Sequence, residues 1–192
     1  VSWVGHPLMD EMQIENDSGE FRRQYGLQNN IPLLAIAPGS RPSEMQRHLP
    51  TLLEALPRIR EKTGEIQCML PVAESLDLKE IKNITEVSPV PVTLVQEQFI
   101  EAIRACDAAI VASGTASLQT ALALTPFVIV YRVSPLTFWI ARHLADTKYI
   151  GLVNVLAERE IVPEILQNDF TVSNITKAAV RLLQDEDYRA TM

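Results

Sequence analysis

The sequence predicts a doubly wound α/β fold, in which helices cover both faces of a parallel sheet. Short apolar runs alternate along the chain with longer segments of helical period. These runs are apolar throughout and do not alternate with polar residues, which is the pattern of strands buried on both faces. The length of 192 residues fits one domain, and a domain of this size buries roughly 70% of the surface that its unfolded chain exposes.

The elements follow from the amino-terminal end. A polar stretch comes first, and its short amphipathic segment at 19–25 ends at Gly26. Residues 42–62 carry apolar side chains at helical spacing, and Thr63 and Gly64 end that pattern as a helix C-cap would. The apolar side chains of this helix are assigned to the core. Six apolar runs are predicted to be strands: 33–37, 66–70, 92–95, 108–112, 127–131 and 150–153.

One domain is the economical organisation, because no linker rich in Pro, Gly or Ser interrupts the chain. Residues 1–30 are expected to form a connecting arm, and residues 31–192 the domain itself. The chain opens within an apolar stretch and ends within a helical one. We therefore expect it to be a piece of a longer protein.

Composition and charge exclude several classes of function. A net charge of -7 and a pI near 5.0 argue against a nucleic-acid partner, which needs clustered Lys and Arg. Without a run of 18 apolar residues or a basic and then apolar leader, neither a membrane span nor a secretion signal is expected. Cys68 and Cys106 lack the spacing of a metal site or disulfide framework, so we expect buried thiols in a reducing cytosol.

The first candidate site is the turn PGSR at 38–41, which follows a predicted strand and precedes a predicted helix. In open α/β sheets, ligands bind outside the carboxyl ends of the strands, where helix N-termini present free amides. Pro42 suits the first helical position and Glu44 the third. Gly39 lets the backbone approach a ligand, and Arg41 supplies a planar fork of donors suited to a diphosphate. A tight turn with an exposed arginine and half a capping box is the alternative interpretation.

The second candidate is the turn at 113–115, between the strand 108–112 and a helix predicted to run to about residue 124. Its residues Ser113, Gly114 and Thr115 form an anion cradle in such a position. Gln119 lies one helical turn further on and faces the same opening, where it can hydrogen-bond a sugar hydroxyl. Ser and Thr are also good helix caps, but two such turns at one sheet edge favour a ligand site.

A third stretch, at 151–171, brings polar residues around Val162 and Pro163, and its spacing alone predicts a loop and a capped helix. The polar residues are Asn154, Arg159, Glu164 and Gln167. The chain has no GxGxxG, P-loop, HExxH or Ser-His-Asp order. Of its scattered histidines, His6 is assigned to a turn and His48 to the surface of a helix.

Five stretches, in the same order, resemble lipid-A-disaccharide synthase. They are VGHPLMD at 4–10, PGSRPSEM at 38–45, ASGTASLQTAL at 112–122, VIVYRVSPLTFWIA at 128–141 and LVNVLAEREIVPEILQ at 152–167. The likeness spans nearly the whole chain and several separate motifs, which a generic nucleotide-binding domain would not share.

The resemblance implies a B-type two-domain glycosyltransferase, of which this chain is the C-terminal, Rossmann-like, donor-binding half, truncated at its end. The complete enzyme would transfer diacylglucosamine from UDP-diacylglucosamine to diacylglucosamine 1-phosphate, forming a β-1,6 linkage and releasing UDP. Neither a metal nor another cofactor is expected. The general base would lie in the missing half, so the fragment alone is expected to be inactive. A cytoplasmic location, at the inner face of the inner membrane, is implied, and a homodimer and peripheral membrane contact are left open.

Site residues are carried over from the resemblance position by position. Gly39, Ser40 and Arg41 are placed at the diphosphate, and Ser113, Gly114 and Thr115 around its oxygens and the ribose. Gln119 is placed at the ribose, and Asn154 and Glu164 along the cleft that faces the absent domain.

The sequence also departs from the family pattern. Gln119 stands where the family has Glu, and a neutral amide accepts fewer bonds from ribose hydroxyls. Val153 replaces an expected proline and Glu158 an expected glycine. A catalytically degenerate paralogue that acts as a binding module is therefore an alternative, as is another UDP-sugar enzyme of this architecture, such as an epimerase or a peptidoglycan glycosyltransferase.

The segment 134–151 allows two interpretations. Its aromatic residues and nearby cations can rest on an anionic membrane surface, or an apolar stripe can pack a helix onto the sheet. We favour packing. The membrane residues would be Phe138, Trp139, Ile140, Arg132, Arg142 and Lys148, and the stripe would be Leu136, Ile140 and Leu144.

Overall fold

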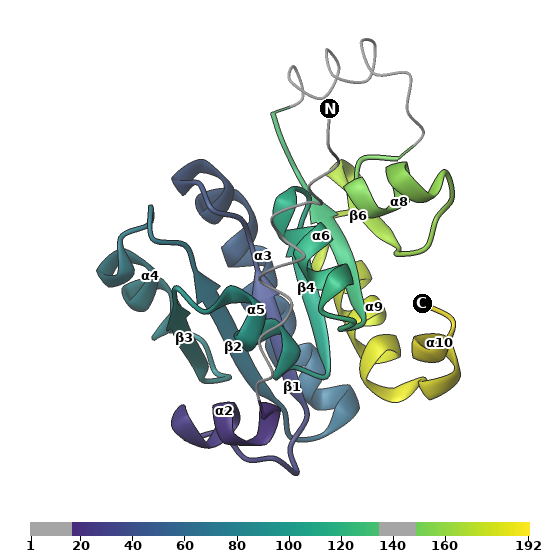
Figure 1. Cartoon of the computed structure of the whole chain (residues 1–192). Coiled ribbons are helices and arrows are strands. Elements are labelled where there is room, and N and C mark those ends of the chain that lie inside the picture. Colours follow the sequence, from purple (N-terminus) through teal and green to yellow (C-terminus); the bar gives the residue numbers. More distant parts are fainter. Residues whose placement is uncertain (1–16, 135–148) are drawn as a thin grey trace, which may run out of the picture.

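The computed structural model describes residues 17–134 and 149–192. Its centre is a six-stranded sheet with every neighbouring pair parallel and the order β3-β2-β1-β4-β5-β6. Helices lie on both faces of this sheet (Figure 1). The predicted doubly wound α/β fold is confirmed, and the strand order is the one that places a topological switch point between β1 and β4.

Five of the six predicted strands are present with small shifts of their ends. The strands are β1 (Leu33–Ala37), β2 (Gln67–Val72), β3 (Val92–Gln96), β4 (Ala108–Ala112), β5 (Phe127–Tyr131) and β6 (Glu164–Leu166). Every residue of β1 and β4 is buried, as expected for central strands covered on both faces.

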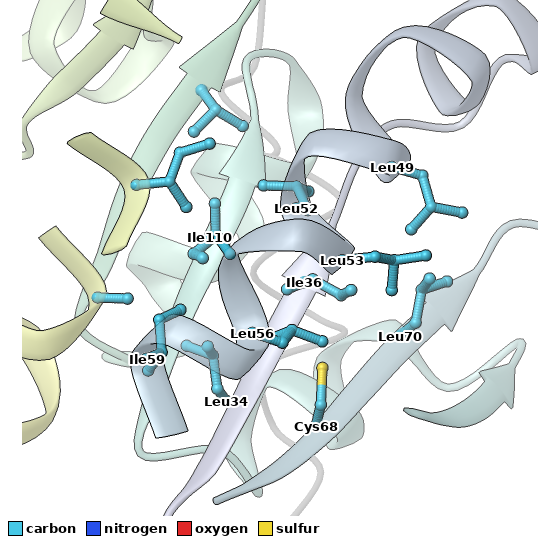
Figure 2. Packing of buried hydrophobic residues seen from close by; sticks show 14 of the residues in the cluster. Leu34, Ile36, Leu49, Leu52, Leu53, Leu56, Ile59, Cys68, Leu70 and Ile110 are labelled. Atoms are coloured by element: carbon cyan, nitrogen blue, oxygen red, sulfur yellow. The ribbon is translucent and has the colours of Figure 1, made fainter. Parts of the chain in front are cut away.

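Successive side chains of each strand point to opposite faces, which creates two cores. On one face, Leu34 and Ile36 of β1 pack beneath α3 (Pro42–Thr63) and α9 (Val172–Gln184), which contact each other. Figure 2 shows the leucines of α3 over β1, β2 and β4 on this face. On the other face, Leu33 and Ala35 pack with the helices α2 (Ser18–Gln24), α5 (Phe99–Arg104) and α6 (Thr115–Leu122). The remaining helices are α4 (Leu78–Thr85), α8 (Leu152–Ala157), η1 (Gln167–Asp169) and α10 (Glu186–Ala190).

Helix α3 confirms the expected boundaries. It begins with Pro42 at its first position after the N-cap Arg41 and ends at the C-cap Gly64, whose φ is 87°. Proline lacks the amide hydrogen that would have no helical acceptor at this position, and glycine adopts a positive φ without the clash of a Cβ.

The predicted strand at 150–153 is wrong. Gly151 is instead the N-cap of α8, and the sixth strand lies at 164–166, where Glu164 pairs with Ile129 of β5. Residues 150–153 form an apolar run too short to separate a strand from a helix by periodicity. Residues 164–166 form the strand because they pair with the free edge of β5.

The expectation that His48 lies on the surface is also wrong, because its side chain is fully buried. His48 lies between Met45 and Leu52 on the stripe of α3 that faces the sheet. A polar residue at a core position of the helical repeat requires internal hydrogen-bond partners.

The described part of the predicted arm packs onto the domain. In α2, Phe21 is buried, and Arg22 donates from Nε to the Ala105 carbonyl (2.7 Å) and from Nη2 to Asp107 (3.0 Å). Cys68 and Cys106 are buried as expected, and burial raises the pKa of both thiols. Within residues 17–134 and 149–192, we find no helix with the length and apolar character needed to span a bilayer.

Candidate functional site

The two predicted turns follow β1 and β4, the central pair of strands. From β1 the chain continues through α3 to β2, and from β4 through α6 to β5, so it leaves this pair in opposite directions. A crevice opens outside the carboxyl ends of strands at such a point, and this crevice is where open α/β sheets bind their ligands. The fold therefore brings the two turns together.

A cleft of about 820 Å³ occupies this position. Seven of the nine predicted site residues line it: Gly39, Ser40, Arg41, Ser113, Gly114, Thr115 and Gln119. The prediction that both turns face one opening is confirmed. Asn154 and Glu164 are not among the lining residues.

The first turn already holds an internal carboxylate. Glu44, at the third position of α3, accepts from the amides of Ser40 (3.1 Å) and Arg41 (3.4 Å) through Oε2, and its Oε1 lies 3.7 Å from Arg41 Nη1. The φ of Gly39 is 130°, and a Cβ there would overlap the Glu44 side chain. Glycine is therefore needed at position 39 to accommodate the Glu44 side chain, whereas it was predicted to let the backbone approach a ligand.

The second turn leaves its amides open. Gly114 is the N-cap of α6, with φ 150°, and no side chain caps this helix. Ser113 instead donates from Oγ to the Ile150 carbonyl (3.1 Å), so the alternative interpretation, in which the hydroxyls only cap the helix, is not supported. Within the part of the chain that the structure describes, the amides of Gly114, Thr115 and Ala116 have no acceptor. They are the free positive end of a helix dipole.

The charges of the lining residues divide the cleft. Arg41 is the one cation among the described residues that line it, and its side chain is 76% exposed. Glu74, Glu97 and Glu101 line the cleft after β2 and β3, and Glu44 lines it beside Arg41. An anion is therefore favoured toward the start of α6, which supplies the free amides, with Arg41 across the cleft.

Asn154 and Glu164 form a second cluster that shapes the loop at 150–164. Asn154 is fully buried and donates from Nδ2 to Val162 O (2.7 Å) and Glu164 Oε1 (2.9 Å). Its Oδ1 accepts from the amides of Ile161 (2.8 Å) and Val162 (3.0 Å). All hydrogen-bonding positions of this amide are thus used internally, so Asn154 builds the loop.

Glu164 connects this cluster to the cleft. Its carboxylate accepts from the amides of Ile150 (3.0 Å) and Gly151 (2.9 Å), and Ser113, a lining residue, donates to the carbonyl of the same Ile150. Glu158 stands where the family pattern has glycine. It is the C-cap of α8, with φ 55° and ψ 17°, and this left-handed backbone explains why a glycine is expected there.

Sequence reasoning missed several residues that shape the cleft. Ser75 donates from Oγ to the Ser40 carbonyl (2.8 Å), Phe99 and Tyr131 line the cleft, and His48 lies buried beneath its edge. The signal for His48 was its place in the apolar repeat of α3. Ser75 carried no signal, because the loop after β2 is brought to Ser40 by the sheet alone.

The structure does not test the predictions for the motif VGHPLMD or for the segment around Trp139, which was expected to pack on the sheet or to contact a membrane. Both lie within residues 1–16 and 135–148, outside the described residues. Within the described ranges, no group of three His, Cys, Asp or Glu side chains is arranged to hold a metal ion.

Comparisons with known proteins bear on the whole chain. The family model described as lipid-A-disaccharide synthetase matches residues 1–192. The lipid-A-disaccharide synthase of Syntrophotalea carbinolica is 38% identical over 192 residues, which are 100% of this chain and 49% of that protein. The chain thus spans about half the length of the curated relatives it matches.

Solved structures show a similar fold at low sequence identity. The ADP-heptose LPS heptosyltransferase II of E. coli superposes with a TM-score of 0.62 at 16% identity, covering 91% of this chain and 54% of that one. The UDP-GlcNAc 2-epimerase of Neisseria meningitidis, solved with UDP-GlcNAc, gives a TM-score of 0.62 at 14% identity, covering 96% of this chain and 46% of that one.

Proposed function

The chain belongs to the lipid-A-disaccharide synthetase family, and from that premise we propose that it is the UDP-sugar-binding part of a glycosyltransferase. The observation that carries the proposal is the cleft at the switch point, which joins the Arg41 guanidinium to an uncapped helix N-terminus. These groups suit the diphosphate of a nucleotide sugar.

In this proposal the diphosphate lies between Arg41 and the amides of Gly114, Thr115 and Ala116. Gln119, one turn along α6 and in the lining of the cleft, donates to or accepts from a ribose hydroxyl. The apolar wall made by Val95, Phe99 and Ile100 then faces the base. The Ser40 and Arg41 amides are already hydrogen-bonded to Glu44. The first turn therefore binds the diphosphate through the Arg41 side chain more than through its backbone.

The proposed chemistry is transfer of diacylglucosamine from UDP-diacylglucosamine to diacylglucosamine 1-phosphate, with release of UDP. Negative charge gathers on the diphosphate as the glycosidic bond to the sugar breaks. Donors that are already fixed in place stabilise this charge without reorganisation, and here they are the α6 amides and Arg41. We propose that this occurs without a metal, that the general base lies outside this chain, and that the full-length enzyme works in the cytoplasm at the membrane.

Calorimetric titration of UDP into Arg41→Ala tests the proposal. We expect UDP to bind roughly tenfold more weakly, which is the lower end for loss of a charged hydrogen bond because Arg41 is well exposed. Arg58→Ala is the matched control: Arg58 lies on the same helix in an exposed ion pair with Glu54 and should leave the affinity unchanged. Equal affinities for wild type and Arg41→Ala would remove the diphosphate from this turn.

A different measurement distinguishes the active enzyme from the alternative, a catalytically degenerate paralogue that acts as a binding module. Disaccharide formation by the full-length parent at an ordinary rate would exclude it, and a folded parent that binds UDP without turnover would favour it. The left-handed backbone at Glu158 shows that this departure from the family pattern is compatible with an ordered loop.

A further inference from the structure

His48 is a buried titratable side chain that the proposed chemistry does not use. Among the described buried residues, His48 and Arg22 are the two that can carry a positive charge. Arg22 is neutralised by Asp107, whereas His48 lies in an apolar layer between α3 and the sheet. The rings of Tyr131 and Phe170 lie 5.9 and 5.4 Å from the imidazole, centroid to centroid.

Both ring nitrogens of His48 have backbone partners. Nδ1 lies 2.6 Å from the Pro38 carbonyl oxygen, which can only accept, so Nδ1 must carry the hydrogen. Nε2 lies 3.1 Å from both the amide nitrogen and the carbonyl oxygen of Arg132, so it bonds to the Arg132 backbone either as an acceptor or as a donor. Both ring nitrogens are thereby satisfied, as burial requires.

These two bonds join parts of the cleft that are not adjacent in the sheet. Pro38 directly follows β1 and precedes Gly39, while Arg132 directly follows β5 and the lining residue Tyr131. Strand β4 lies between β1 and β5, and the turn 113–115 continues from its end. His48 therefore bridges across β4 beneath the two turns of the cleft.

Neighbouring contacts strengthen this bridge from both sides. On α3, Glu44 lies one turn before His48 and holds the Ser40 and Arg41 amides, so the helix contacts the first turn at two successive points. Beyond β5, the Gln167 amide, in the orientation that satisfies both its ends, donates to the Val133 carbonyl (3.2 Å) and accepts from the Val133 amide (3.3 Å). The segment after β5 is thus fixed on either side of Arg132.

We propose that His48 is a positioning residue for nucleotide binding, which acts through Pro38 and Arg132 to hold Arg41 opposite the α6 amides. It makes no contact with the nucleotide. This inference rests on the proposed function, because the affinity it sets is that for UDP.

Three substitutions separate the two bonds. His48→Leu removes both, His48→Asn retains a donor near the Nδ1 position, and His48→Gln retains an amide near the Nε2 position. We expect UDP to bind roughly tenfold more weakly to folded His48→Leu, the loss expected when alignment worth about one hydrogen bond is removed. His48→Asn should recover most of this affinity, because the shorter bond goes to Pro38.

Thr176→Val is the matched control for a loss of stability alone. Thr176 is buried in α9, and its hydroxyl donates to the Val172 carbonyl (2.7 Å), so its removal should lower stability without changing UDP affinity. Wild-type affinity in folded His48→Leu would overturn the proposal. If His48→Leu does not fold, the Asn and Gln variants decide, and wild-type UDP affinity in both would overturn the proposal.

A readout without nucleotide distinguishes failure of this inference from failure of the proposed function. In NMR spectra of the free protein, the imidazole should carry a hydrogen on Nδ1, bonded to Pro38 O, and the variants should shift the Gly39 and Gly114 amides. An Nδ1 without a hydrogen, or unshifted amides, would contradict the positioning role. If the Nδ1 hydrogen and the amide shifts were as expected but the wild type did not bind UDP, the nucleotide site would be rejected, and with it the role of His48 there.

Discussion

Replacing Asn154 tests whether this residue builds the loop or contacts a ligand. The substitution Asn154→Ala removes two accepted and two donated hydrogen bonds, at 2.7 to 3.0 Å. It also leaves the amide and carbonyl of buried Val162 without partners. At about 1 kcal/mol for each bond, we expect a loss of about 3–5 kcal/mol, a large part of the 5–15 kcal/mol that typically stabilises a folded domain.

The isosteric variant Asn154→Asp sharpens the test. It preserves the acceptor for the Ile161 and Val162 amides but turns an oxygen toward Val162 O and the Glu164 carboxylate. We expect it to be as unstable as Asn154→Ala at neutral pH. Burial beside a carboxylate raises the pKa of the introduced carboxyl group above its unfolded value, so its penalty should shrink as the pH falls and grow as it rises.

Urea denaturation and hydrogen exchange of the Val162 amide measure these effects. Asn174→Ala is the control, because this exposed asparagine donates one side-chain hydrogen bond, to the Asp169 carbonyl, and should cost less than about 1 kcal/mol. If Asn154→Ala unfolded at the wild-type urea concentration, exchanged Val162 no faster and lost UDP binding, then Asn154 would be a ligand contact and our assignment would be refuted.

Two further predictions concern backbone conformation. Glu158→Gly should raise the free energy of unfolding by about 0.5–1 kcal/mol, because φ is 55° there; in thermal unfolding, a glycine variant no more stable than Glu158→Ala would contradict this. Gly39→Ala should cost about 2–4 kcal/mol from a φ of 130° and overlap with Glu44. Gly64→Ala, with φ 87° and open space around it, should cost less, and equal losses in urea denaturation would show that the overlap with Glu44 has no effect.

The sheet was largely predictable because its strands are short, apolar and buried. Five runs kept their type, and the two central strands, β1 and β4, are buried along their whole length. The sixth was misplaced because 150–153 is the more apolar run, whereas 164–166 begins with Glu164 and is a strand only through its register with Ile129. The surface assignment of His48 failed for a related reason: residue type was given more weight than helical position.

The candidate site was predictable in its location and less so in its detail. The position of two turns at one sheet edge follows from strand order, so Arg41 and Thr115 could be placed in one cleft. The bond from the Arg41 amide to Glu44 is the half capping box of the alternative interpretation, whereas the bond from the Ser40 amide to the same carboxylate could not be predicted from the spacing. The saturation of Asn154 depends on how the loop folds back onto Val162, and the spacing of residues alone does not encode that contact.

The central claim is that one cleft at the switch point holds a nucleotide diphosphate between Arg41 and the start of α6. An NMR titration of UDP into this chain tests it most directly. We predict the largest amide shifts at Gly114, Thr115 and Ala116, smaller ones at Gly39 and Arg41, and a reduced response in Arg41→Ala. Saturable UDP binding that shifts amides elsewhere and leaves both turns unchanged would contradict the claim.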